Sequence, residues 1–240
     1  FPAIDLFGGQ AVRLLRGDYG KMTRYSGDPL AVARGFRERG ARFLHLVDLE
    51  GAKSGGQENF EAIRRIVTES GLQAEVGGGI RTLEGIRRYL ALGAFRVVLG
   101  TAALDEDFLR RALAEFGERI AVGVDLKDGR VAVKGWTEVT GEEGFDFCRR
   151  MERLGAATLI CTDISRDGAM RGANRGLYAR LVKEVDCRIV ASGGVSTLED
   201  IRALAKTGAA GAIVGRALYT GDIRLEEALA AAREEEHNAL

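Results

Sequence analysis

The segment Gly78-Gly79-Ile80-Arg81-Thr82-Leu83-Glu84 is repeated in similar form 115 residues later, as Gly193-Gly194-Val195-Ser196-Thr197-Leu198-Glu199. Further matches share this offset: Gly40 with Gly155, Asp48 with Asp163, and Gly100-Thr101-Ala102 with Gly215-Arg216-Ala217. Ala3-Ile4-Asp5-Leu6 is matched by Gly123-Val124-Asp125-Leu126 at an offset of 120. Independent matches at nearly one offset indicate two copies of a half-length pattern, approximately residues 1–118 and 119–240.

Short apolar runs alternate with amphipathic segments along the whole chain. The runs predict eight strands: Ala3–Leu6, Phe43–Asp48, Gln73–Val76, Arg96–Leu99, Ile120–Leu126, Thr158–Thr162, Arg188–Ala191 and Gly211–Val214. The segments predict eight helices: Leu30–Arg39, Glu58–Ser70, Leu83–Leu92, Asp107–Phe116, Glu142–Leu154, Arg175–Glu184, Leu198–Lys206 and Arg224–Glu235. An open, doubly wound sheet would not readily explain the repeat. We therefore expect an α/β fold, a single (β/α)8 TIM barrel domain over residues 1–240 built of two fused half-barrels.

Bulk composition excludes several classes of partner. The formal net charge is zero, which gives no reason to expect a nucleic-acid surface. No apolar run reaches the roughly 18 residues that span a bilayer, and no signal peptide is visible at Phe1-Pro2-Ala3. Three scattered cysteines lack metal-ligand spacing, and we expect them to be reduced thiols: Cys148, Cys161 and Cys187. We expect a cytoplasmic protein, and a monomer.

Glycine follows four of the predicted strands, in two symmetric pairs. The first half contributes Gly78, Gly79, Gly100 and Thr101, and the second half contributes Gly193, Gly194, Gly215 and Arg216. In a barrel these loops lie at the ligand-binding face, where glycine lets backbone N–H groups approach an anion and a following short helix adds its positive end. Any one cluster could serve only a tight turn. Four clusters in two pairs predict two phosphate sites on opposite sides of the mouth, and a small metabolite with a phosphate at each end.

An aspartate ends the first predicted strand and the fifth. In an eight-stranded barrel these strands are opposed, so Asp5 and Asp125 should face each other across the mouth. A lone aspartate at a strand end is often a loop anchor. Two at equivalent positions between phosphate sites favour an acid–base pair, in which one carboxyl ionises while the other keeps its proton.

Other residues near the mouth are weaker candidates. Thr162 ends the sixth strand, and Asp167-Gly168 follows it in a segment that a simple turn would also explain. We include three more side chains that could hold phosphate or stack on a flat ring: Arg13, Arg81 and Trp136. We expect a structural role for His45. The sequence shows no metal-ligand spacing, nucleophile elbow or dinucleotide fingerprint, so we expect proton transfer with no metal and no cofactor.

Five motifs in order resemble the phosphoribosylformimino-AICAR-phosphate (ProFAR) isomerases of histidine biosynthesis: Pro2-Ala3-Ile4-Asp5-Leu6, Gly77-Gly78-Gly79-Ile80-Arg81, Val133-Lys134-Gly135-Trp136, Thr162-Asp163-Ile164-Ser165-Arg166-Asp167-Gly168 and Ala191-Ser192-Gly193-Gly194-Val195. The resemblance runs essentially end to end. It implies an Amadori rearrangement of the bisphosphorylated aminoaldose ProFAR to the aminoketose PRFAR. It also implies that Asp5 is the base that removes the C2 proton, that Asp125 is the acid assisting ring opening, and that Thr162 is the third functional residue. Asp167 is an alternative acid, or a supporting group.

The sequence departs from the family pattern at Cys161, where we expect a ring-bearing residue, and this departure should alter packing rather than chemistry. The sister barrel, the cyclase subunit of imidazole-glycerol-phosphate synthase, has Cys-Leu-Asp where this chain has Ala3-Ile4-Asp5, and a lysine that Phe7–Val12 lacks. Two alternatives stay open. One is an isomerase that also accepts phosphoribosylanthranilate, and the other is a non-catalytic barrel that only binds phosphorylated metabolites.

Overall fold

The computed structural model describes the backbone of residues 1–238 and the side chains of residues 1–234. Eight parallel strands form its barrel: β1 (Ala3–Phe7), β4 (Phe43–Asp48), β5 (Gln73–Gly77), β6 (Arg96–Leu99), β7 (Ile120–Lys127), β10 (Thr158–Asp163), β11 (Arg188–Ser192) and β12 (Gly211–Ala212). Each pairs with the next in chain order. The sheet closes where Pro2 bridges Val214 in parallel and the Ala3 N–H donates to the Val214 carbonyl at 3.1 Å. The predicted TIM barrel is confirmed.

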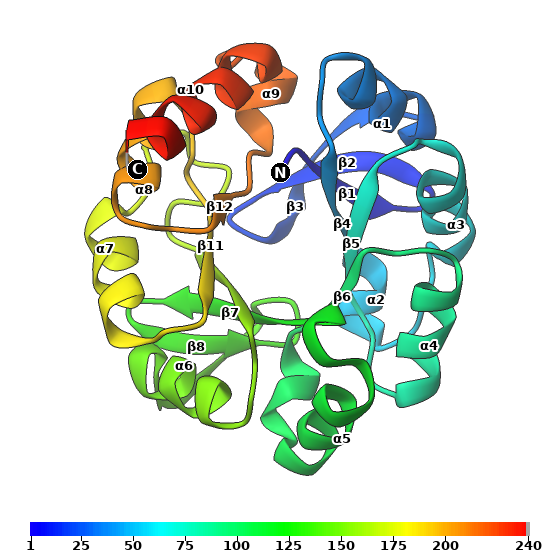
Figure 1. Ribbon diagram of the computed structural model, residues 1–240. Helices are drawn as coiled ribbons and strands as arrows, with labels where there is room; N and C mark the ends of the chain where they lie inside the picture. Colours follow the sequence, from blue (N-terminus) through cyan, green and yellow to red (C-terminus); the bar gives the residue numbers. More distant parts are fainter. Residues whose placement is uncertain (239–240) are drawn as a thin grey trace.

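Helices surround the barrel, as Figure 1 shows in a view along its axis. They are α1 (Pro29–Glu38), α3 (Phe60–Glu69), α4 (Leu83–Ala91), α5 (Glu106–Phe116), α6 (Gly144–Arg153), α7 (Arg175–Glu184), α8 (Leu198–Lys206) and α10 (Leu225–Asn238). All eight correspond to predicted segments. The eighth strand is shorter than predicted, because only Gly211 and Ala212 pair continuously with β11. None of the helices in the described part of the chain is long and apolar enough to cross a membrane.

An antiparallel extension follows the first barrel strand of each half. β1 continues into β2 (Gln10–Leu15) and β3 (Asp18–Ser26), and β7 continues into β8 (Arg130–Val133) and β9 (Glu138–Glu143). The short apolar runs Gln10–Leu15 and Arg130–Lys134 predict hairpin-like extensions at β2 and β8. β3 and β9 were not predicted, because their largely exposed polar residues give no strand pattern. Three short helical turns at the mouth were also missed: α2 (Leu49–Ser54), η1 (Thr101–Leu104) and α9 (Arg216–Thr220).

Two separate apolar regions stabilise the fold. The larger lies between the strands and the surrounding helices, with Phe36, Tyr89 and Phe147 among its buried rings. The smaller fills the inside of the barrel with residues from five strands and with Ile213, which directly follows β12: Ala3, Val98, Ala121, Ile160, Val190 and Ile213. The barrel is therefore a packed core, and its ligand-binding space lies above this inner layer.

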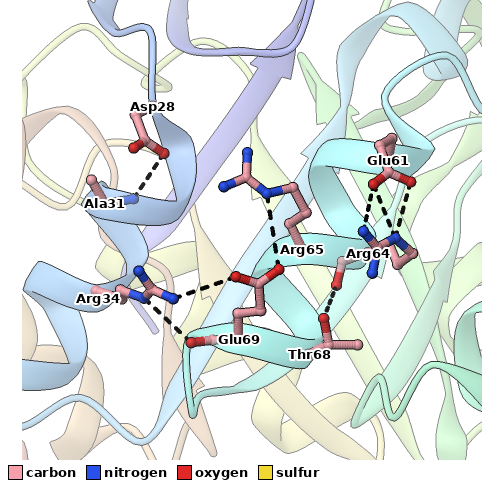
Figure 2. Close-up of polar contacts among 8 residues, drawn as sticks. All are labelled: Asp28, Ala31, Arg34, Glu61, Arg64, Arg65, Thr68 and Glu69. Atoms are coloured by element: carbon pink, nitrogen blue, oxygen red, sulfur yellow. Dashed lines mark hydrogen bonds and ion pairs between the residues drawn. The ribbon is translucent and has the colours of Figure 1, made fainter.

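Ion pairs join neighbouring helices around the outside of the barrel. In Figure 2, Arg34 of α1 reaches Glu69 of α3 at 3.4 Å, while the Asp28 side chain accepts the Ala31 N–H at the start of α1. Comparable pairs join other helices: Arg87–Glu115, Arg150–Glu106, Arg149–Glu184 and Arg202–Glu234. These pairs are largely solvent-exposed, so each contributes little alone.

Candidate active site

A cavity of about 190 Å³ opens at the carboxyl ends of the barrel strands. It brings together most of the predicted site residues: Asp5, Arg13, Gly78, Gly79, Arg81, Gly100, Thr101, Asp125, Trp136, Thr162 and Asp167. A smaller cavity of about 20 Å³ adjoins it and is lined by the rest: Gly168, Gly193, Gly194, Gly215 and Arg216. Arg13, Asp167 and Ser192 line both cavities. The two glycine groups therefore lie at different ends of one continuous site.

Asp5 is ion-paired with Arg13. β1 places Asp5 at the mouth, and β2 pairs beside it with Asp5 opposite Val12. Arg13 Nη1 donates to Asp5 Oδ2 at 2.8 Å, and Arg13 Nη2 lies 3.7 Å from Asp167 Oδ1. Burial alone would lower the pKa of Arg13, but the two carboxylates outweigh it and the pKa is raised. The sequence identified Arg13 only as a side chain near the mouth that could hold phosphate or stack on a ring, whereas in the structure it bridges two carboxyl groups.

Asp125 has no such cation. It sits near the end of β7 in register with Thr162 of β10, and Trp136 lies within reach of its carboxyl group. Desolvation by the surrounding protein raises the pKa of Asp125, and the hydrogen-bonding side chains of Trp136 and Thr162 offset only part of this effect. Asp125 therefore holds a proton more tightly than a free aspartate.

Asp167 is the third carboxyl group of the site. It follows β10 in a turn in which its N–H donates to the carbonyls of Asp163 and Ile164. Burial and the charges of Asp5 and Asp125 raise the pKa of Asp167, and the nearby Arg13 lowers it; the net result is a pKa of about 6. A carboxyl group that titrates near neutrality can serve as an acid at physiological pH.

The first-half glycines lie against backbone that leaves no room for side chains. Gly78 and Gly79 have φ values of +101° and +71°, and a Cβ on Gly78 would clash with the backbone of Asp48. The Asp48 carboxylate is fully buried, and it accepts the Gly51 N–H at 2.8 Å and Asn59 Nδ2 at 2.7 Å. The Asp48–Asn59 pair thus holds the loop on which Gly78 and Gly79 rest.

The second half repeats this arrangement. Gly193 and Gly194 have φ values of +91° and +82°, and a Cβ on Gly193 would clash with the backbone of Asp163. Asn174 Nδ2 donates to Asp163 Oδ2 at 2.6 Å. Asn59 and Asn174 were missed at the sequence level, although the repeat offset relates them as it relates Asp48 and Asp163. In the described part of the chain, no acceptor meets the backbone N–H of Gly79 or of Gly194.

The remaining candidates are held by neighbouring backbone. Arg81 lies on Gly55 and the Trp136 ring lies on Gly17, since a Cβ on either glycine would clash with these side chains. Thr101 Oγ1 accepts the Lys134 N–H at 2.9 Å, and Arg216 Nη1 donates to the Gly168 carbonyl at 2.7 Å. Trp136 thereby joins the second-half extension to the first-half hairpin.

Within the described residues, no group of three or more His, Cys, Asp or Glu side chains is arranged to hold a metal ion. All three cysteines are free, and Cys148 and Cys161 are buried. The side-chain groups at the mouth are carboxyl, hydroxyl, guanidinium, ammonium, imidazole and indole groups, and backbone N–H groups lie beside them.

Comparison with known proteins gives a consistent picture. The family model described as "Histidine biosynthesis protein" matches residues 1–224. A relative from Roseiflexus castenholzii is 48% identical over 231 residues, covering 96% of this chain and 98% of the relative. A relative from Listeria monocytogenes is 47% identical over 228 residues, covering 95% of each. Both are named 1-(5-phosphoribosyl)-5-((5-phosphoribosylamino)methylideneamino) imidazole-4-carboxamide isomerase.

Proposed function

This chain belongs to the histidine biosynthesis protein family, and we propose that it catalyses the isomerisation for which its relatives are named, the conversion of the aminoaldose ProFAR to the aminoketose PRFAR. The observation that carries the proposal is the placement of three carboxyl groups in one site whose two adjoining cavities are each lined by a glycine group. The relatives' substrate name contains two phosphoribosyl groups. A ligand with a phosphate at each end matches a site with a glycine group at each end.

The two glycine groups supply the phosphate contacts. In the first half, the backbone N–H groups around Gly79 and Thr101, together with Arg81, bind one phosphate. In the second half, the backbone around Gly194 and Gly215, together with Arg216, binds the other. The uncommitted N–H groups of Gly79 and Gly194 support this assignment. Trp136 stacks on the flat imidazole ring of the substrate.

The carboxyl groups move the protons. An acid protonates the ribose ring oxygen as the bond from C1 to that oxygen breaks, which gives a Schiff base. Asp5, ion-paired with Arg13, removes the C2 proton to form an enolaminol. The proton held by Asp5 then adds to C1, and the C2 hydroxyl gives its proton back to the ionised acid, which leaves the C2 carbonyl of the aminoketose. The atoms balance within substrate and enzyme, because the reaction is an internal redistribution of hydrogen.

Asp125 is the acid in this scheme, as the resemblance implies, and its raised pKa supports the assignment. Asp167 is the second candidate because its pKa, raised to about 6, keeps part of the population protonated at neutral pH. Comparing Asp125→Asn with Asp167→Asn separates them. The variant without the acid loses turnover at every pH, whereas the other retains a measurable rate with a displaced pH profile.

Absorbance-monitored turnover of ProFAR, coupled to the next pathway enzyme, tests the function. A folded protein that binds both phosphates without turnover would be the non-catalytic barrel. Phosphoribosylanthranilate, offered in the same assay format, tests for a second substrate. We further propose that the enzyme acts in the cytoplasm as a monomer, since one chain supplies every residue of the site, and size-exclusion chromatography tests the oligomeric state.

A further inference from the structure

Three polar side chains lie next to one another on the inner wall of the barrel. His45 of β4 is in register with Glu75 of β5, and Glu75 is in register with Arg96 of β6. His45 is also in register with Ala3, which belongs to the inner apolar layer. Arg96 Nη1 reaches across to Thr158 Oγ1 at 3.4 Å, on β10. This row therefore occupies the barrel interior beneath the active site, and the proton-transfer scheme above does not use it.

Glu75 is ionised and both of its oxygens are occupied. The residue is fully buried, with Oε1 2.6 Å from His45 Nδ1 and Oε2 accepting from Arg96 Nε at 2.6 Å. Burial raises the pKa of Glu75, but its contacts with His45 and Arg96 outweigh this effect and lower it. An ionised carboxylate only accepts hydrogen bonds, so His45 Nδ1 must be the donor.

The other side of the imidazole belongs to the active site. His45 lines the large cavity together with Asp125, Thr162 and Asp167, and its side chain is 12% exposed. In the described part of the chain, Nδ1 is the only ring nitrogen of His45 with a hydrogen-bond partner. Nε2 is thus the nitrogen left for a ligand.

We propose that Glu75, anchored by Arg96, is a positioning residue that keeps the His45 proton on Nδ1, so that an unprotonated Nε2 accepts a hydrogen bond from a ribose hydroxyl of the substrate. The substrate identity rests on the proposed function, whereas the tautomer does not. Under this proposal His45 has a role beyond the structural one that the sequence led us to expect. It gives the mouth a neutral acceptor among carboxyl groups that must exchange protons.

Several charged groups surround His45 and influence whether its imidazole is protonated. Glu75 faces it from β5, and the cavity adds Asp5 from β1, Asp125 from β7 and Asp167 from the turn after β10. The cations are Arg96 beyond Glu75, and Arg13 from β2. Arg96 balances the charge of Glu75, and the raised pKa values of Asp125 and Asp167 reduce the negative charge there.

Nitrogen-15 NMR of protein labelled at histidine tests the tautomer directly. The chain has two histidines, so a His237→Gln variant identifies the His45 signals. At pH 7 we expect the His45 pattern of a protonated Nδ1 and an unprotonated Nε2, with Nε2 shifting when product binds. A proton on Nε2, or an imidazolium at pH 7, overturns the proposal. This measurement needs no substitution in the barrel.

Kinetics test the role of Glu75 with two matched double variants. Glu75→Gln with Arg96→Met removes both charges but keeps an acceptor for Nδ1, whereas Glu75→Leu with Arg96→Met removes the acceptor as well. We expect kcat/KM within about threefold of wild type in the first and roughly tenfold lower in the second, with His45 signals of mixed tautomers in the second. Equal rates in both overturn the positioning role. An inactive wild type would instead contradict the proposed function, leaving the tautomer result intact.

Discussion

The two halves of the barrel carry an aspartate at the same place, and only the first half gives it a cation. Asp5 is in register with Val12 of β2, and Asp125 is in register with Ala132 of β8. The next residue of the extension is Arg13 in the first half and Val133 in the second, and both line the cavity. Arg13 reaches Asp5 at 2.8 Å, whereas valine brings no charge.

This one difference separates the two carboxyl groups in their chemistry. Asp5 has the Arg13 guanidinium within hydrogen-bond distance. Asp125 has only neutral hydrogen-bonding neighbours, and burial raises its pKa. We propose that the duplicated scaffold acquires opposite proton-transfer roles through the strand beside each aspartate, while the aspartates themselves stay the same.

The largest effect is expected from Asp5→Asn, which removes the first-half carboxylate. Turnover should fall by roughly 10³-fold, because the base for the C2 proton is lost, while KM changes only a few-fold because both phosphate contacts remain. Asp107→Asn, at an exposed site on α5, is the matched control and should behave as wild type. Steady-state kinetics and product binding by calorimetry measure both quantities. A rate within a few-fold of wild type would show that Asp5 is not the base.

A second prediction uses the equivalent glycines Gly215 and Gly100. Their backbone angles are similar, with φ values of −105° and −91°, but a Cβ on Gly215 would overlap the Arg13 guanidinium whereas one on Gly100 meets nothing within 4 Å. Gly215→Ala should therefore displace Arg13 from Asp5 and lower kcat/KM by about 100-fold. Gly100→Ala restricts a backbone of similar φ but creates no clash, so it should lower kcat/KM by about tenfold or less. Equal losses would mean that the Arg13–Asp5 contact is unimportant.

A third prediction concerns the stability cost of Asp167. Its pKa is about 6 in the folded protein, against 3.8 for an unperturbed aspartate, so the folded state binds the proton more tightly than the unfolded chain. Between these values, rising pH ionises the unfolded state first, and the free energy of unfolding falls by about 3 kcal/mol in total. Asp167→Asn removes this loss. The free energy of unfolding of the variant should therefore rise relative to that of wild type from pH 4 to pH 7. Urea unfolding at several pH values measures the difference, and a constant difference would contradict it.

Much of this architecture could be predicted because the repeat and the apolar runs report directly on burial. The eight barrel strands and eight surrounding helices follow from residues that face the core. β3 and β9 could not be predicted in this way, since their side chains are mostly exposed and no buried face imposes a pattern.

The structure brings the candidate residues together at the mouth, but the contacts among them could not be predicted from the sequence. All the proposed residues line the two cavities, but nothing in the sequence shows that Arg13 joins Asp5 to Asp167, because that contact depends on the twist of a β-hairpin. Asn59 and Asn174 could have been found from the repeat offset alone. The row under the site escaped prediction because His45 in an apolar strand resembles a core residue, and its partner Glu75 lies on a different strand.

The smallest effect expected lies at the outer surface, where the repeat relates Arg87 to Arg202. Arg87 binds Glu115 through two nitrogens at 2.7 and 2.8 Å, whereas Arg202 reaches Glu234 through one contact at 3.5 Å. Arg87→Gln should lower the melting temperature slightly and more than Arg202→Gln, because a two-point contact fixes the guanidinium better. The difference should vanish in about 1 M salt, which screens exposed charges. Scanning calorimetry at low and high salt measures the melting temperatures of both variants. An equal shift in the two variants would show that the outer ion pairs, unlike the residues at the mouth, do not differ between the two halves.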